Sequence, residues 1–167
     1  LVISTVEHHA VLDTAEDLER HAHVRVTRVP VDRDGLVDPA AVQRALDDRT
    51  ALVSIMHANN EIGTIEPIEA IGRICRGRGV AFHTDAVQTV GVLPFDVREL
   101  PVDLVSINAH KFYGPKGVGA LYVRTGTRIA TMQTGGGQEK GRRTGTENVA
   151  GIVALGVFVP VLAAAKG

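Results

Sequence analysis

The sequence predicts an α/β domain in which helices cover both faces of a mostly parallel sheet, giving three α/β/α layers. Two observations support this fold class. Apolar runs of strand length alternate with amphipathic segments of helix length along most of the chain. Several runs, such as residues 51–56, are continuously rich in apolar residues, which is typical of strands buried on both faces of a parallel sheet.

The apolar runs predict strands, and the segments between them predict helices. Strands are expected at residues 1–6, 24–31, 50–57, 80–84, 103–107 and 118–123. Helices are expected at residues 10–21, 38–46, 67–78 and from 148 onward. Asp38 is placed to cap its helix, with Pro39 at the first helical position, and Gly79 is placed to end the third helix. Residues 125–146 predict a long, Gly-rich connection that is too polar to lie in the core.

Composition limits the class of protein. The chain of 167 residues is long enough for one domain with a buried core. Its net charge of −1 and its lack of a basic run argue against nucleic acid or an acidic membrane surface as a partner. The single cysteine, Cys75, excludes an internal disulfide and suits a reducing cytoplasm. Residues 152–165 are apolar but shorter than the ~20 residues that cross a bilayer, so we expect a core helix there.

Both ends of the sequence resemble cuts within a domain. Leu1-Val2-Ile3 begins within an expected strand and has no charged leader, and residues 163–167 stop without a helix cap. We therefore expect residues 1–167 to be part of a longer protein.

Polar side chains follow the carboxyl ends of successive expected strands. Because these ends share one edge of a parallel sheet, the side chains are expected to border one crevice. The residues are His8, Asn60, Asp85 with Gln88, and His110 with Lys111.

A lysine and a carboxylate on neighbouring strand ends suit one particular chemistry. A partly desolvated Lys111 amine can attack a carbonyl carbon and form a Schiff base. A carboxylate such as Asp85 beside a pyridine nitrogen keeps that nitrogen protonated, which makes the ring an electron sink. An imidazole such as His8 can stack on the ring and move protons. This is the equipment of pyridoxal 5'-phosphate (PLP) chemistry.

Five ordered motifs strengthen this interpretation. Together they resemble the signature blocks of the cysteine desulfurases, which belong to the class V aminotransferase group of fold-type I PLP enzymes. The resemblance extends over nearly the whole chain. The motifs are EHHAVL at 7–12, MHANNEIG at 56–63, HTDAVQ at 83–88, HKFYGPKG at 110–117 and RTGTEN at 143–148.

The resemblance implies a role for each matching residue at the ring of the cofactor. Lys111 would form the Schiff base and Asp85 would pair with the pyridine nitrogen. His8 would stack on the ring and help to move protons. Gln88 would bind the phenolic oxygen, with Asn60 nearby and placed to meet the substrate carboxylate.

The resemblance also implies contacts with the phosphate and with a second subunit. His110 would contact the phosphate. Thr146 matches a threonine that reaches the phosphate of the neighbouring subunit's cofactor, so a homodimer is implied. At the position where the family has a phosphate-binding serine this chain has Asn108, whose amide can still donate to phosphate. Ser106 is a weak substitute, since it shares a strand face with Asn108.

The implied activity takes sulfur from L-cysteine onto an enzyme cysteine, for transfer to a sulfur-acceptor protein in iron–sulfur cluster or thiolation pathways. The chain would be an incomplete PLP-binding large domain. The N-terminal Gly-Thr phosphate loop and the C-terminal half, with the catalytic cysteine and a substrate-binding arginine, fall outside it. Cys75 is expected to be structural, because it lies inside an expected helix. The chain alone is therefore expected to be inactive.

Parts of the sequence pattern also fit other functions. A selenocysteine lyase or another class V aminotransferase shares much of the pattern. A short-chain dehydrogenase would need its Tyr and Lys on one helix, whereas Tyr113 and Lys116 flank Gly-Pro. A metal hydrolase would use His83, Asp85 and His110 as ligands. A truncated domain that only dimerises or binds a partner is the non-enzymatic alternative.

Overall fold

The computed structural model describes residues 1–131 and 133–164. It has a six-stranded sheet with the order β2-β1-β3-β4-β5-β6. Every neighbouring pair is parallel except β5 and β6, which are antiparallel. The strands are β1 (Val2–Ser4), β2 (Thr27–Val29), β3 (Leu52–Ser54), β4 (Ala81–Asp85), β5 (Leu104–Asn108) and β6 (Gly119–Val123).

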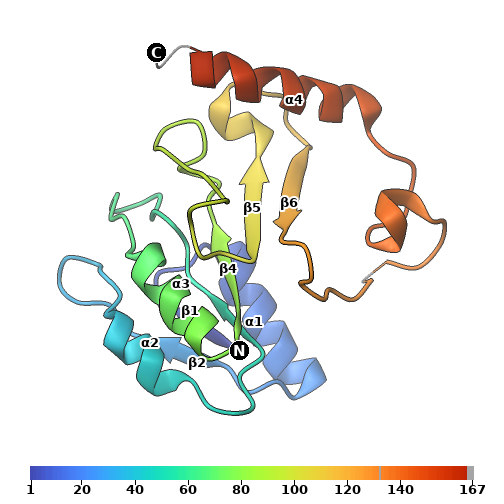
Figure 1. The fold of residues 1–167 in the computed structure, drawn as a ribbon. Coiled ribbons are helices and arrows are strands. Elements are labelled where there is room, and N and C mark those ends of the chain that lie inside the picture. Colours follow the sequence, from blue (N-terminus) through green and yellow to red (C-terminus); the bar gives the residue numbers. More distant parts are fainter. Residues whose placement is uncertain (132, 165–167) are drawn as a thin grey trace.

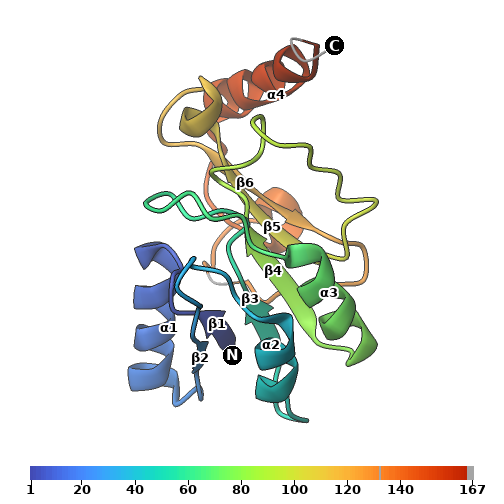
Figure 2. The same cartoon turned by 90° about the vertical axis from the view of Figure 1, so that its left-hand side faces the viewer.

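Helices lie on both faces of this sheet, which confirms the predicted three-layer α/β class. Figure 2 shows α1 (His9–Ala22) on one face and α2 (Pro39–Ala45) with α3 (Ile68–Gly77) on the other. The short 3-10 helix η1 (Ala109–Phe112) follows β5, and α4 (Val149–Ala164) crosses beyond it (Figure 1). A second short helix, η2 (Gln138–Gly141), lies in the long connection after β6.

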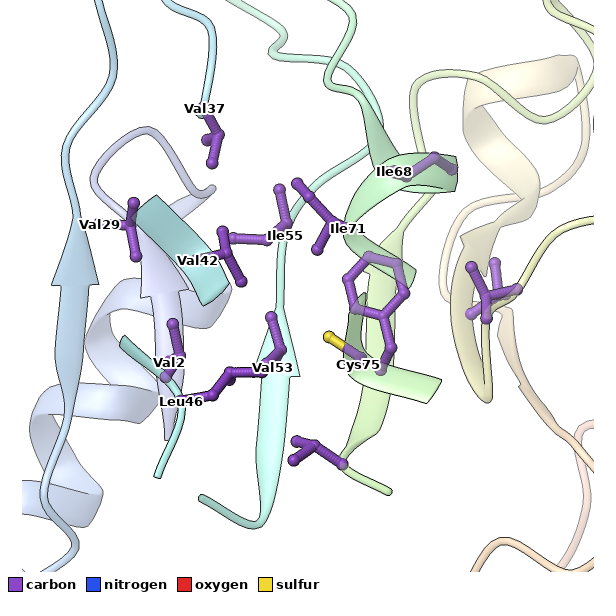
Figure 3. Close-up of a cluster of buried hydrophobic side chains, with 14 of the residues drawn as sticks. Val2, Val29, Val37, Val42, Leu46, Val53, Ile55, Ile68, Ile71 and Cys75 are labelled. Atoms are coloured by element: carbon purple, nitrogen blue, oxygen red, sulfur yellow. The ribbon is translucent and has the colours of Figure 1, made fainter. Parts of the chain in front are cut away.

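The main core lies between the sheet and the layer formed by α2 and α3 (Figure 3). Ile71 and Cys75 of α3 are fully buried against Val53 and Ile55 of the β3 segment. Ile68 is also buried, and Ile74 packs against the cluster as a partly buried side chain. At about 25 cal/mol per Å² of apolar surface removed from water, such packing is the main stabilising contribution to the domain.

Several helix boundaries follow the sequence signals. The carboxylate of Asp38 accepts a hydrogen bond from Ala40 N at 2.9 Å, and Pro39 is the first residue of α2. After α3, Gly79 has φ +67°, a left-handed conformation that a side chain would strain. Most observed strands are shorter than the apolar runs that predicted them, because hydrogen-bonded pairing extends over only part of each run.

The described part of the C-terminal helix is less buried than predicted. We expected a core helix at residues 152–165, but of the described side chains of α4, which end at Val157, only Leu155 is buried. Leu155 packs in a small second cluster with Phe112 and Val118. Four apolar side chains, Val149, Ile152, Val153 and Val157, are 41–64% exposed. In the described part of the chain, no helix is long and apolar enough to span a bilayer.

Candidate functional site

The strand order brings the predicted site residues to one edge of the sheet. β1, β3, β4 and β5 are parallel and adjacent in that order, so their carboxyl ends lie side by side. His8 follows β1, and Asn60 follows β3 after a short extended segment. Asp85 is the last residue of β4, and Lys111 lies in η1 directly after β5. The carboxylate and the amine therefore come from neighbouring strand ends.

Asp85 is held by its own backbone turn. Its carboxylate Oδ1 accepts a hydrogen bond from Val87 N at 3.0 Å, and its carbonyl oxygen accepts one from His57 N at 2.9 Å. The first contact is the hydrogen bond that an Asp side chain commonly makes to the backbone two residues further along the chain. This contact fixes Oδ1. The side chain is half-buried, and its second oxygen, Oδ2, can accept a hydrogen bond from a further donor.

His8 caps helix α1 with its ring. Its Nδ1 accepts a hydrogen bond from Ala10 N at 3.1 Å while the side chain stays exposed. Because Nδ1 is the acceptor, the neutral ring carries its proton on Nε2. The contact also restricts rotation of the ring, which would favour stacking on a planar ligand.

Lys111 and His110 are exposed on the short helix η1. Asn108 starts this helix, since its Oδ1 accepts a hydrogen bond from His110 N at 3.3 Å. Phe112, only 2% exposed, anchors the helix in the second apolar cluster. Within residues 1–131 and 133–164, the Lys111 amine makes no hydrogen bond or ion pair, so it is open to an incoming group.

Asn60 and Gln88 border the same open cleft, of about 300 Å³, at the ends of β3 and β4. Its wall is partly apolar, with Ile65 and Val92 each more than half exposed. The remaining lining residues are Ala58, Asn59, Gly63, Thr89 and Leu93. Two of the sequence-predicted residues thus line one concave surface, whereas His8, Asp85 and Lys111 are not among the residues that line it.

Behind this edge lies Glu7, a buried carboxyl group that sequence reasoning did not single out. Its Oε1 accepts hydrogen bonds from Ser4 Oγ at 2.5 Å and from Met56 N at 2.9 Å, linking the ends of β1 and β3. Burial raises the pKa of Glu7 to about 7, and the negative charges of Asp85 and Glu66 act in the same direction. The position of a glutamate directly before His8, at the end of an apolar strand, was the available signal.

Two further histidines are held inside the fold. His57 is buried and its Nδ1 pairs with Thr89 Oγ1 at 2.8 Å, as expected for a hydrogen-bonded core histidine. His83 pairs through Nε2 with Ser106 Oγ at 2.9 Å. Ser106, which we considered as a substitute phosphate ligand, therefore already has a partner within the sheet.

Thr146 does not follow one of the parallel strands that carry the other predicted site residues. It lies in the exposed segment between η2 and α4. The predicted role of Thr146 is a contact with a neighbouring subunit. The position of Thr146 within one chain does not test that contact, so the role stays a prediction.

Two alternative functions lose support from the geometry. Tyr113 has φ +69° in the turn after η1, and Lys116 lies in the following loop, so the pair does not share a helix as in a dehydrogenase. Among the described residues, no group of three or more His, Cys, Asp or Glu side chains is arranged to hold a metal ion. The set His83, Asp85 and His110 is therefore no metal site in this structure.

Comparison with known proteins agrees with the sequence motifs. The family model described as "Aminotransferase class-V" matches residues 1–166. Cysteine desulfurase IscS of Dictyoglomus turgidum is 58% identical over 156 residues, which cover 93% of this chain and 39% of the relative. Cysteine desulfurase IscS of Methanosarcina thermophila is 53% identical over the same share of this chain and 38% of its own.

Solved structures also resemble this chain over nearly its whole length. A NifS-like protein, 45% identical, superposes with a TM-score of 0.92 over 97% of this chain and 45% of its own. A structure described as SspA in complex with cysteine, 41% identical, has a TM-score of 0.90 over 95% of this chain and 46% of its own. The chain thus spans about two fifths of the length of the curated relatives it matches.

Proposed function

Since the chain belongs to the class V aminotransferase family, we propose that it is the PLP-binding part of a cysteine desulfurase. The observation that carries the proposal is the placement of Lys111 and Asp85 on neighbouring parallel strand ends. The similarity to cysteine desulfurases over 93% of the chain supports the same activity.

The residues present fit the proposed cofactor. The exposed amine of Lys111 is free to bond an aldehyde carbon, and Asp85 keeps one carboxylate oxygen for a ring nitrogen. When bound, PLP would supply an electron sink for breaking bonds at the α-carbon of an amino acid. Asp85 would hold the ring nitrogen protonated, because a nearby negative charge favours the charged form.

The other strand-end residues would orient the cofactor and move protons. His8, fixed through Nδ1, would stack on the ring and present its Nε2 proton at the site. Gln88 and Asn60, which line one cleft, would bind the phenolic oxygen and the substrate carboxylate. His110 and the free amide nitrogen of Asn108 would donate to the phosphate.

The complete reaction would use L-cysteine and a thiol outside this chain. The carbon–sulfur bond of cysteine would break, L-alanine would leave, and the sulfur would form a persulfide on a protein thiol. Cys75 is excluded as that thiol, because it is fully buried and burial raises its pKa to about 12. We also propose a cytoplasmic homodimer, in which Thr146 reaches the neighbouring site, and a separate sulfur-acceptor protein. Within this dimer, residues 1–167 would be an incomplete large domain.

Covalent trapping tests the cofactor. The protein is incubated with PLP, reduced with borohydride and mapped by peptide mass spectrometry. The label is expected on Lys111, to be lost in Lys111→Ala and kept in Lys116→Ala, the matched control from the adjacent loop. A label on Lys116, or none on either lysine in the wild type, would refute the assignment of Lys111.

Substrate preference is a separate measurement. Alanine and sulfide, or alanine and selenide, are measured from L-cysteine and L-selenocysteine in the presence of a thiol reductant, using the protein at its full length. We expect turnover of cysteine. Turnover of selenocysteine alone would indicate a selenocysteine lyase, and dimerisation without PLP labelling would indicate a non-catalytic domain.

A further inference from the structure

One histidine near the candidate site hydrogen-bonds to serines on both neighbouring strands. His83 of β4 pairs through Nδ1 with Ser54 Oγ of β3 at 2.7 Å and through Nε2 with Ser106 Oγ of β5 at 2.9 Å. We name this arrangement the Ser54–His83–Ser106 bridge. Both ring nitrogens are used, so the bridge ties three parallel strands together through side chains as well as through the backbone.

The bridge lies on the same face of the sheet as Asp85. Side chains two residues apart on a strand point to the same face, so His83 and Asp85 share one face of β4. Phe82 and Thr84, which alternate with them, are fully buried, and Phe82 belongs to the core on the opposite face. Ser106 is the residue of β5 in register with Asp85. The bridge is therefore next to the Asp85 carboxylate within the sheet.

The three bridged strands lead to the proposed cofactor ligands. β3 leads to the cleft that contains Asn60, β4 ends at Asp85, and β5 leads into η1 with Lys111. His83 lies two residues before Asp85, the last residue of β4. Because the bridge fixes the spacing of the three strands there, it also limits how far Asp85 and Lys111 can move apart.

The charge of His83 also matters to Asp85. Burial lowers the pKa of His83, and the charge of Asp85 opposes this effect only in part. Asp85 is the charged group that raises the pKa of the ring against this effect of burial. A neutral imidazole can donate from one nitrogen and accept at the other, and serine hydroxyls adapt to either tautomer. A neutral His83 does not neutralise Asp85, so the carboxylate stays available to a cationic ring nitrogen.

We propose that His83 is a positioning residue: through the Ser54–His83–Ser106 bridge it fixes the Asp85 carboxylate in relation to Lys111. This inference deepens the proposed function and rests on it. His83 would not touch the cofactor or the substrate. It would act through Asp85, by holding the strand ends in register and by leaving the carboxylate without a competing cation.

Substitution of the bridge tests this role. His83→Phe keeps a ring but removes both hydrogen bonds, and Ser106→Ala removes one of them. Thr84→Val is the matched control, because Thr84 is the buried neighbour on the other face and its hydroxyl has no partner among the described residues. The readouts are the dissociation constant for PLP and the pH midpoint of the absorbance change of the bound cofactor, which reports the charge environment of its ring.

We expect the borohydride label to stay on Lys111 in every variant. His83→Phe should weaken PLP binding by about five- to tenfold and shift the pH midpoint, as expected for the loss of a hydrogen-bonded support. Ser106→Ala should change the PLP affinity and the pH midpoint in the same direction as His83→Phe, but by a smaller amount. Thr84→Val should match the wild type in both.

The outcomes separate the two proposals. If the wild type is not labelled on Lys111, the proposed function fails. If the wild type is labelled and a folded His83→Phe matches it in affinity and pH midpoint, the role of His83 is overturned. If circular dichroism shows that His83→Phe does not fold, Ser106→Ala decides: a wild-type midpoint overturns the role, and a shifted one supports it.

Discussion

Glu7 makes the stability of this protein depend on pH in a way that one substitution isolates. Glu7 is only 5% exposed, and its Oε1 accepts two hydrogen bonds. Glu7→Gln keeps an oxygen acceptor for Ser4 Oγ and Met56 N but removes the titrating proton. Oε2, which has no hydrogen-bond partner among the described residues, is the atom that changes most.

The magnitude follows from the pKa. Burial raises the pKa of Glu7 from its ordinary value of 4.5 to about 7 in the folded chain. At about 1.4 kcal/mol per pKa unit, this difference corresponds to about 3.5 kcal/mol. The folded state binds this proton more tightly than the unfolded state. The stabilisation is therefore fully present below pH 4.5 and is lost as the pH rises toward about 7.

Urea unfolding of wild type and Glu7→Gln at several pH values between 4 and 8 measures the effect. The free energy of unfolding of the wild type should fall by about 3 kcal/mol relative to the variant between pH 4.5 and 7. His57 and His83, whose pKa values burial lowers, titrate in both proteins and cancel in the difference. Glu66, whose pKa burial also raises, titrates in both proteins too, but its charge acts on Glu7 and therefore contributes to the difference. Glu99→Gln, an exposed control, should run parallel to the wild type. If the free energy of unfolding of Glu7→Gln also changed with pH in parallel with that of the wild type, the idea that Glu7 is a buried, neutral carboxyl group would be refuted.

Three other predictions concern packing, reactivity and capping. Gly72→Ala should lower the free energy of unfolding by about 1–3 kcal/mol in urea titrations, because an added Cβ would lie 2.4 Å from the carbonyl oxygen of Pro101. Unchanged stability would show that α3 and the backbone at Pro101 can move apart to accept the added Cβ. Cys75 should resist a thiol reagent such as DTNB in the native protein and react once urea unfolds it, and rapid native labelling would contradict its burial. Asp38→Ala should cost about 1 kcal/mol through loss of the hydrogen bond to Ala40 N, measured by thermal unfolding, whereas Asp38→Asn should retain most of the stability.

Much of the architecture could be predicted from local pattern. Alternation of apolar runs and amphipathic segments predicted the parallel part of the sheet, and Asp38 with Pro39 marked the start of α2 correctly. These signals work because they depend on backbone chemistry within a few residues. The resemblance to class V aminotransferases is likewise confirmed by the family match over residues 1–166.

Features that depend on distant partners were harder to predict. The direction of β6 is antiparallel because the connection from Asn108 to Gly119 is too short for a crossover, a signal that was present but not used. The exposure of α4 could not be predicted, since an apolar helix is buried only if other elements lie against it. The hydrogen bonds of Glu7 and His83 join residues far apart in sequence, which periodicity does not register.

The parallel order of the sheet has a consequence for the time course of folding. β1 pairs with β3, with Val2 opposite Val53, so this contact must close a long stretch of chain before it is stabilised. The edge that carries His8 and Lys111 needs β1, β3, β4 and β5 together. We therefore expect the proposed site-specific labelling of Lys111 by PLP to appear in refolding only after these four strands have paired.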